Sequence, residues 1–323
     1  MLRFLVWVGL VGVMLASLIS FGGYWWPSLD SINHFRPFLF AGFALVAALA
    51  LFARLRLAFA LGVFLVLAQG WFLIAEILPE AHFGSIAAET AGVPLKVISF
   101  NMLDKRVDAA GLARMVERER PDVLVLIEAW PNTAHVLAEL KPFLPYRLDC
   151  FSAHFCDVAI LTRHPFTKTY VWDPPAGEPR ENNVSLMSVT FEKDGIPVTV
   201  WGTHLDWPVP ARGQTMQFEA MRKDLQDAGP NTILAGDFNS TPWSFALQRF
   251  GAAIPLHRIT RAMPTWPSEK AVFRGRHSVR AFGPFMPLDH IFIGKAIRKT
   301  DVRRGPYLGS DHYPVIADLK LVD

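Results

Sequence analysis

Three long apolar runs without a charged residue lie near the start of the chain, and they restrict its fold more than any other feature. They cover residues 4–21, 37–53 and 57–75. A helix needs about 17–25 consecutive apolar residues to cross a bilayer, and each run has about that length. Hydrophobic residues make up 51% of the chain, a high share that these runs help to explain. We therefore expect three transmembrane helices within residues 1–80.

Two alternatives remain open for these runs. The first run follows Arg3 and could instead be a cleaved signal peptide, which also pairs a basic start with an apolar stretch. The other two runs could be helices buried in a large core. Trp25, Trp26 and Trp71 stand near the expected helix ends, and tryptophan is typical of the membrane interface.

The basic residues of the short loops predict an orientation. Arg3, Arg54 and Arg56 would share one side of the membrane, and Arg36 would lie on the other. Short cytoplasmic loops carry the excess of lysine and arginine. We therefore expect the N-terminus in the cytoplasm and everything after about residue 80 outside it.

The remainder of the chain predicts one soluble domain. A linker is expected at residues 81–94, and residues 95–323 are long enough to bury a sizeable core. The formal net charge of the whole chain is only +3. Bulk charge therefore gives no support for non-specific binding of nucleic acid.

Cys150 and Cys156 are the two cysteines of the chain. In an exported domain such a pair could form a disulfide, with two free thiols as the alternative. A bare pair without further Cys or His ligands is a poor zinc site.

Short apolar runs and amphipathic runs alternate along the soluble part. Strands are expected at residues 95–100, 123–127, 157–162, 184–191, 198–202, 232–235, 289–293 and 314–319, and helices at 108–120 and 212–228. Asp194-Gly195 lies between two strands and predicts a hairpin. Asp108 is expected to cap the first helix and Thr241, before Pro242, to cap a later one. Interleaved strands and helices with a hairpin indicate an α/β fold with mixed sheets.

Polar side chains gather at the ends of these strands. They are Asn101, Glu128, His204, Asp237, Asn239, Asp289, Asp311 and His312. Each alone could be a turn residue, a surface carboxylate or a helix cap. Strands packed in one core bring their ends to a common rim, where these side chains would converge. Oxygen ligands without thiols suit a hard cation such as Mg²⁺, with Mn²⁺ as the alternative.

Six short motifs carry a resemblance to a known family. They are Ser99-Phe100-Asn101, Leu126-Ile127-Glu128, Gly202-Thr203-His204, Gly236-Asp237-Phe238-Asn239-Ser240, Leu288-Asp289-His290 and Ser310-Asp311-His312. In this order they resemble the endonuclease/exonuclease/phosphatase superfamily over about residues 95–322. The resemblance implies a four-layer sandwich, in which helices flank two mixed β-sheets. The added apolar region resembles membrane-anchored bacterial members and implies a multi-pass protein of the bacterial inner membrane, with its catalytic domain on the periplasmic or extracellular side.

The resemblance also implies a role for each polar residue. Glu128 matches the metal-binding glutamate, and Asn101 and Asp311 would lend oxygens near the metal. Asp237 matches the residue that orients or deprotonates the attacking water, and Asn239 matches its phosphate-holding neighbour.

Two histidines complete the implied site. His204 and His312 match histidines that contact the phosphate, and Asp289 would orient His312. Leu103 departs from the nuclease branch, which carries an acid at this position, and Asp104 stands beside it. This departure puts a second metal site in doubt.

These features favour a magnesium-dependent phosphoester hydrolase, with phosphodiesters ahead of monoesters. The substrate could be a nucleic acid, a phospholipid headgroup or a small phosphorylated molecule such as an inositol phosphate. The aromatic loops at residues 172–175 and 282–287 could stack bases, rest on lipid headgroups or pack on their own domain. A non-catalytic membrane receptor for a phosphorylated ligand is the alternative from another class. The bilayer is an expected partner, and no protein partner can be inferred.

Overall fold

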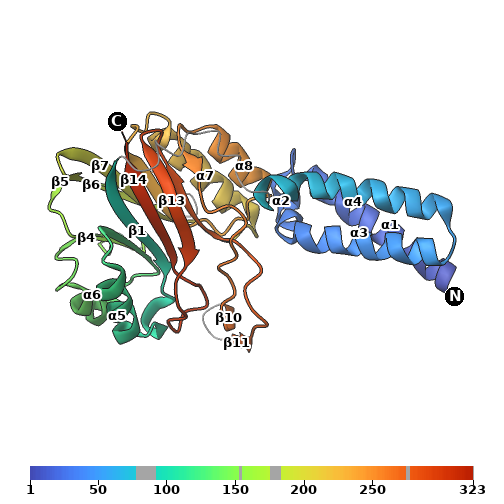
Figure 1. The fold of residues 1–323 in the computed structure, drawn as a ribbon, viewed down its shortest axis with the longest axis horizontal. Helices are drawn as coiled ribbons and strands as arrows, with labels where there is room; N and C mark the ends of the chain where they lie inside the picture. Colours follow the sequence, from blue (N-terminus) through green and yellow to red (C-terminus); the bar gives the residue numbers. More distant parts are fainter. Residues whose placement is uncertain (78–91, 153–154, 175–182, 274–276, 323) are drawn as a thin grey trace.

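The computed structural model describes residues 1–77, 92–152, 155–174, 183–273 and 277–322. A bundle of long helices extends from one side of a larger domain built on β-sheets (Figure 1). The N-terminus lies at the end of the bundle that is far from this domain, and the C-terminus lies on the domain itself (Figure 1).

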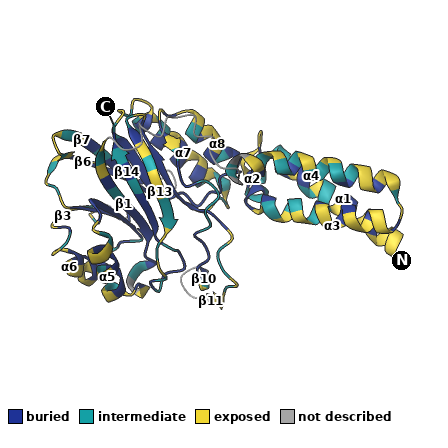
Figure 2. Ribbon diagram, viewed as in Figure 1, coloured by how far each residue is buried: buried dark blue, intermediate teal, exposed yellow. Residues whose placement is uncertain are grey.

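Three helices of the bundle are long and apolar enough to cross a membrane, as predicted. They are α1 (Leu2–Gly22), α3 (Arg36–Phe52) and α4 (Arg56–Ile77). Val6, Leu10 and Ala50 pack in the middle of the bundle. Much of the remaining apolar surface points outward (Figure 2), and Trp71 for example is 76% exposed. An apolar exterior of this kind is typical of a lipid-facing bundle.

A short connection between α1 and α3 contacts the sheet domain. It consists of α2 (Pro27–Asp30) and the 3₁₀ helix η1 (Ser31–Phe35), and we call residues 27–35 the connector. The connector lies between the long helices and the sheet domain (Figure 1). Its buried side chains include Asp30, Asn33 and His34.

Two six-stranded mixed sheets form the core of the domain. The first has the order β13 (Ile297–Arg304), β14 (Val315–Leu321), β1 (Val93–Asn101), β2 (Val123–Ile127), β4 (Val158–Thr162) and β3 (Tyr146–Asp149). The second has the order β5 (Phe166–Val171), β6 (Ser185–Lys193), β7 (Ile196–His204), β8 (Thr232–Asp237), β12 (Asp289–Ile293) and β9 (His257–Arg258). A separate hairpin pairs β10 (Lys270–Phe273) with β11 (His277–Arg280). The predicted hairpin is confirmed as β6–β7, with Asp194 and Gly195 at positive φ.

The two sheets pack face to face between two layers of helices. Val97, Val125, Val200 and Ile233 are among the buried residues between the sheets. Helices α5 (Ala109–Glu119) and α6 (Ala134–Leu140) cover the first sheet, and α7 (Ala211–Leu225) and α8 (Phe245–Ala252) cover the second. Short 3₁₀ turns η3 (Asp104–Arg106) and η4 (Pro131–Thr133) precede α5 and α6. The predicted four-layer α/β sandwich is confirmed.

Helix α5 shows how the sequence sets these boundaries. Asp108 caps it by accepting a hydrogen bond from the Gly111 amide at 2.9 Å, as predicted. Leu112 and Met115 are buried on one face, which matches the spacing of a helix that packs on a sheet. Arg120 adopts a left-handed conformation with φ 50° and ends the helix, directly before Pro121.

The sequence analysis did not anticipate β3, β5, β9, β10, β11, β13 or α6, and two further details differ. Helix α8 is capped by Ser244, which accepts from the Leu247 amide at 3.2 Å, so the predicted cap at Thr241 is wrong. Thr241 lies before the helix, and its amide instead donates to His34 Nδ1. Most of the expected linker lies outside the described residues, and β1 begins at Val93, within the range expected for the linker.

Candidate active site

Three neighbouring strands of the second sheet, β7, β8 and β12, place a row of polar side chains at their ends. The parallel pairing of β7 with β8 sets His204 opposite Asp237, and the antiparallel pairing of β8 with β12 sets Asp237 opposite Asp289. Alternate residues of a strand share a face, and Ala235 and Ile291, two positions along, are buried between the sheets. The side chains of this row therefore point to the same face as the core between the sheets, and they lie where that core ends at the rim.

The first sheet contributes residues from its own strand ends. Asn101 ends β1 and is paired with Ile127, and Glu128 follows directly after β2. Ser310 donates to the Asn101 carbonyl oxygen at 2.7 Å, and the His312 amide donates to Ser310 Oγ at 3.0 Å. These bonds hold the loop before β14 against the end of β1.

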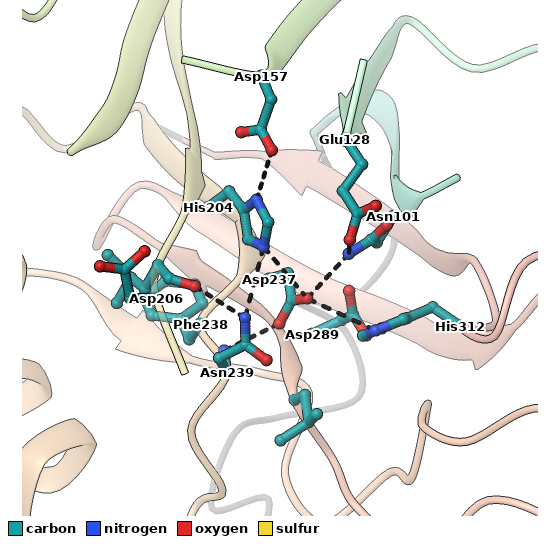
Figure 3. Close-up of polar contacts among 12 residues, drawn as sticks. Asn101, Glu128, Asp157, His204, Asp206, Asp237, Phe238, Asn239, Asp289 and His312 are labelled. Carbon is teal, nitrogen blue, oxygen red and sulfur yellow. Dashed lines mark hydrogen bonds and ion pairs between the residues drawn. The ribbon is translucent and has the colours of Figure 1, made fainter. Parts of the chain in front are cut away.

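Asp237 is the centre of the resulting cluster (Figure 3). The side-chain amide of Asn101 donates to Asp237 Oδ2 at 3.0 Å and to Glu128 Oε1 at 3.2 Å. His312 Nε2 lies 3.6 Å and His204 Nε2 lies 3.9 Å from the same Asp237 oxygen. Asn101, His204 and His312, from both sheets, thus meet at the Asp237 carboxylate, and Asn101 links it to Glu128.

Each histidine is paired with a second aspartate. His312 Nδ1 lies 2.8 Å from Asp289 Oδ2, and His204 Nδ1 lies 2.8 Å from Asp157 Oδ2. Burial lowers the pKa of both rings, but the neighbouring carboxylates outweigh it and raise the pKa of each to about 10. Both histidines are therefore imidazolium ions at neutral pH, suited to stabilise negative charge on a substrate.

Asp157 is the one member of this arrangement that the sequence analysis missed. Its side chain also accepts a hydrogen bond from Ser185 Oγ at 3.0 Å, which fixes its orientation toward His204. The available signal was its place at the start of the apolar run 157–162, the same position that Asp289 holds before its own strand.

Asn239 lies beside Asp237 through a tight turn. Its backbone amide donates to Asp237 Oδ1 at 2.8 Å, and its side-chain amide donates to the Leu205 carbonyl oxygen at 2.8 Å. Its φ is 46°, in the left-handed region that asparagine tolerates better than most residues. Gln214 of α7 donates to the Asn239 carbonyl oxygen at 3.1 Å. The turn is thus held from both sides.

Burial disfavours the ionised forms of the two central acids of the cluster. Burial raises the pKa of Asp237 to about 6; the Asp289 carboxylate adds to this rise, whereas His312 and His204 oppose it. Burial likewise raises the pKa of Glu128. Deprotonating both acids is unfavourable without a further positive charge, and a divalent cation supplies that charge directly.

The donor set fits such a cation. Asp237 and Asp289 offer carboxylate oxygens within 4.8 Å of one another, and His312, which lies within the same distance, would as an imidazolium ion offset their charge rather than bind the cation. Asp289 Oδ1 and Asn239 Oδ1 are buried and have no hydrogen-bond partner among the described residues. Unsatisfied buried acceptor oxygens of this kind are costly unless an ion or a bound ligand satisfies them.

Two of the expected metal ligands show other contacts. Asp311 Oδ2 accepts from Trp266 Nε1 at 3.2 Å and from the Val272 amide at 3.1 Å. Asn101 turns its nitrogen toward the carboxylates, while its oxygen accepts from the Leu103 amide at 3.1 Å. A role for the Asn101 oxygen as a ligand would require the side-chain amide to turn over. Their roles as metal ligands stay predictions.

The cysteine pair lies close to this site in the chain. Cys150 and Cys156 form a disulfide, and both are buried against the inter-sheet core. Asp157 follows Cys156 directly. The disulfide therefore closes the loop from which the partner of His204 emerges.

Comparisons with known proteins place the chain in a structural context. The model of the Endonuclease/Exonuclease/phosphatase family matches residues 98–312. No curated protein matches the sequence significantly.

Solved structures share the fold at low sequence identity. An endonuclease/exonuclease/phosphatase from Beutenbergia cavernae DSM 12333 is 21% identical with a TM-score of 0.55, over 71% of this chain and 72% of the other. TDP2 from D. rerio, complexed with a single-strand DNA product, is 17% identical with a TM-score of 0.55, over 70% and 99%. A beta toxin mutant from Staphylococcus aureus with bound magnesium ions is 17% identical with a TM-score of 0.53, over 72% and 100%.

Proposed function

Because the chain belongs to the Endonuclease/Exonuclease/phosphatase family, we propose that it is a membrane-anchored, divalent-metal-dependent hydrolase of phosphoester bonds, with phosphodiesters as the favoured substrates. One observation carries the proposal. Asp237 is surrounded by two histidines, each held by its own aspartate, while Asn101 links it to Glu128. This arrangement combines a base, two cationic groups and a set of oxygen ligands at one point.

The acids of the site would hold a Mg²⁺ ion, with Mn²⁺ as the alternative. Glu128 is the principal ligand in this proposal, with Asn101 and Asp311 lending oxygens nearby. When bound, the ion polarises the phosphoryl oxygens and lowers the pKa of a bound water. The raised pKa values of Glu128 and Asp237 support a cation here, because its charge would favour their ionised forms.

The residues of the chain divide the remaining work. Asp237 orients a water molecule and accepts one of its protons as the water oxygen bonds to phosphorus. The ester P–O bond breaks on the opposite side, and the leaving oxygen takes up a proton to become an alcohol. Protonated His204 and His312 stabilise the charge on the phosphoryl oxygens, and Asn239 holds the phosphate. Positioning and fixed charge of this kind supply much of enzymatic rate enhancement.

We propose three parts for the chain: a membrane region at residues 1–80, a linker at 81–94 and a catalytic domain at 95–323. The apolar helices support the first part. The N-terminus and the connection between α3 and α4 lie at the end of the bundle far from the sheet domain (Figure 1). Arg3 stands at the first place and Arg54 and Arg56 at the second, which supports a cytoplasmic N-terminus and a catalytic domain outside the cytoplasm of a bacterial inner membrane. The disulfide also suits an oxidising compartment.

A substrate screen tests the proposed activity. The full chain in detergent would be assayed with single-stranded and duplex DNA, phospholipids, inositol phosphates and nucleotides, first with EDTA and then with Mg²⁺ or Mn²⁺. We expect hydrolysis of at least one phosphodiester, only with metal. A folded protein that hydrolyses no phosphoester under these conditions, but binds a phosphorylated ligand, would support the receptor alternative instead.

A reporter fusion tests the proposed orientation. An alkaline phosphatase or a fluorescent protein that folds only in the cytoplasm would be fused after Asp323. We expect the phosphatase to be active and the fluorescent protein dark. The opposite pattern would place the catalytic domain in the cytoplasm.

A further inference from the structure

An apolar groove lies between the connector and the candidate active site. It has a volume of about 390 Å³ and runs from residues 31–35 of the connector to Asn239. Its walls also include residues 207–209, which follow β7, and Met286 and Leu288 before β12. The membrane region and the catalytic domain therefore build this groove together. Its volume is within the range of small-ligand sites, about 300–1,000 Å³.

The lining of the groove selects the chemistry of a ligand. Ile32, Phe35, Trp207, Val209 and Met286 give it a largely apolar wall. Among the described residues that line it, none is lysine or arginine. A nucleic acid strand would need cationic groups along its backbone, whereas an apolar chain needs only exclusion of water. The lining thus favours a hydrocarbon chain.

Aromatic side chains lie between the groove and the first turn of a candidate membrane helix. Phe35 is 48% exposed at the end of η1, and Phe38, in the first turn of α3, is 53% exposed. The Phe38 ring contacts Phe285 with centroids 5.5 Å apart, and Phe285 belongs to the loop that carries Met286. Aromatic side chains at such a position suit the membrane interface. A lipid that leaves the bilayer along α3 would meet these aromatic side chains next to the groove.

The polar end of the groove is the candidate active site. Asn239 lines the groove, and its backbone amide donates a hydrogen bond to Asp237 Oδ1. We infer that the groove binds the apolar chain of a membrane lipid whose phosphoester headgroup is presented to Asp237 and Asn239. This inference rests on the proposed phosphoester hydrolysis and specifies its substrate class. The groove adds a binding site for the lipid chain. The bond cleaved is the same phosphoester P–O bond as in the proposed function.

Two synthetic substrates separate this inference from the proposed activity. Methyl p-nitrophenyl phosphate and decyl p-nitrophenyl phosphate carry the same phosphodiester and differ only in their alkyl chain. With the full chain in detergent and Mg²⁺, we expect kcat/KM to be at least about tenfold higher for the decyl ester, because its methylenes leave water for the groove. Hydrolysis of neither ester would contradict the proposed function. Equal hydrolysis of both would contradict the groove while leaving that function intact.

Matched variants locate the preference in the groove. Phe35→Glu and Val209→Glu place a charge at partly exposed groove positions, and Tyr146→Glu places the same charge on β3, away from the groove. Their native side chains are 48%, 70% and 40% exposed, so that each substitution is tolerable for folding. We expect the two groove variants to lose the decyl preference and keep methyl ester hydrolysis, and Tyr146→Glu to keep both. Loss of preference in all three, or in none, would overturn the inference.

A binding experiment gives a readout that is independent of hydrolysis. The full chain would be reconstituted with EDTA into vesicles of phosphatidylethanolamine and phosphatidylglycerol that contain phosphatidylcholine with a diazirine in its acyl chain. After irradiation, we expect label on residues 207–209 and 286–288 as well as on α4, and in Val209→Glu a several-fold loss on the groove segments only. Label confined to the long helices, or displacement of the groove label by a single-stranded oligonucleotide, would contradict a lipid site.

Discussion

His34 of the connector lies 3.2 Å from the Thr241 backbone amide, which donates a hydrogen bond to its Nδ1 atom. The Trp243 indole donates to the His34 carbonyl oxygen at 3.2 Å. Thr241 stands two residues after Asn239, so a segment between two candidate membrane helices supports the turn that carries Asp237 and Asn239. The connector is thus part of the architecture of the site.

Replacing His34 tests this support. In His34→Ala the Thr241 amide loses its acceptor, and a net hydrogen bond of about 1 kcal/mol predicts a fall in kcat of up to about tenfold. His34→Asn restores an acceptor and should recover part of the rate. His135→Ala, an exposed histidine on α6, serves as the control and should match the wild type. Wild-type kcat in His34→Ala would contradict the support.

Asp237→Asn should abolish turnover and preserve the fold. The amide cannot accept a proton from water, and loss of a general base typically costs about 10²–10⁴-fold in rate. Rates would be measured with Mg²⁺ on the best substrate of the screen, beside the thermal unfolding midpoint. Asp206→Asn, an exposed neighbour, should stay active. A rate close to that of the wild type would remove Asp237 from the proposed chemistry.

The pairing of His204 with Asp157 predicts a pH-dependent stability. The pKa of His204 is raised from 6.5 to about 10 in the folded protein, so that its contribution is fully present below pH 6.5 and is lost as the pH rises through about 10. Asp157→Asn should lower the unfolding midpoint of the metal-free protein at pH 7 and approach the wild type near pH 10. Parallel pH curves for the two proteins would contradict the pairing.

The disulfide should stabilise the same region. In a chain-entropy model, closing a loop as short as that between Cys150 and Cys156 contributes about 2 kcal/mol. Cys150→Ala/Cys156→Ala should therefore unfold more easily and lose activity, since Asp157 follows the loop. Dithiothreitol should reproduce the effect in the wild type and leave the double variant unchanged. If dithiothreitol also destabilised the double variant, the effect of the reductant would not come from this disulfide.

Asp30 provides a test of how firmly the connector is docked. Its carboxylate accepts from the Phe245 amide at 3.0 Å and from the Ala246 amide at 2.8 Å, at the start of α8. Loss of a helix cap costs about 1 kcal/mol, so Asp30→Ala should loosen the connector. Faster amide hydrogen exchange at residues 30–35 and 241–247 would show this, and unchanged exchange at residues 109–119 is the internal control. Unchanged exchange throughout would contradict the docking.

The sequence predicted the rim because strand ends follow simple rules. Asn101, Glu128, His204 and Asp237 each end or follow an apolar run, and pairing of the strands brings them together. Asp157, directly before β4, escaped because its role depends on contact with His204 of the other sheet. Its contact is a property of the two-sheet sandwich, which the local sequence does not encode.

The error at Thr241 has a related origin. Thr241-Pro242 and Ser244-Phe245 both offer a plausible helix start. The structure selects Ser244, and the connector meets both places, with His34 at Thr241 and Asp30 at Phe245. Contacts between residues so distant in the chain cannot be predicted from a local sequence pattern. The same holds for the groove, whose walls come from separate segments of the chain.

The pairing of β7, β8 and β12 determines where the chain can accept an inserted residue. His204, Asp237 and Asp289 are aligned by the register of these strands, and a side chain inverts its face with each single-residue shift. Inserting one residue within any of the three strands would therefore turn one of these side chains away from the rim. Insertions before or after the strands leave the alignment intact. The polar row thus depends on the register of the three strands, whereas the length of the adjoining loops, such as residues 205–210, can change without disturbing it.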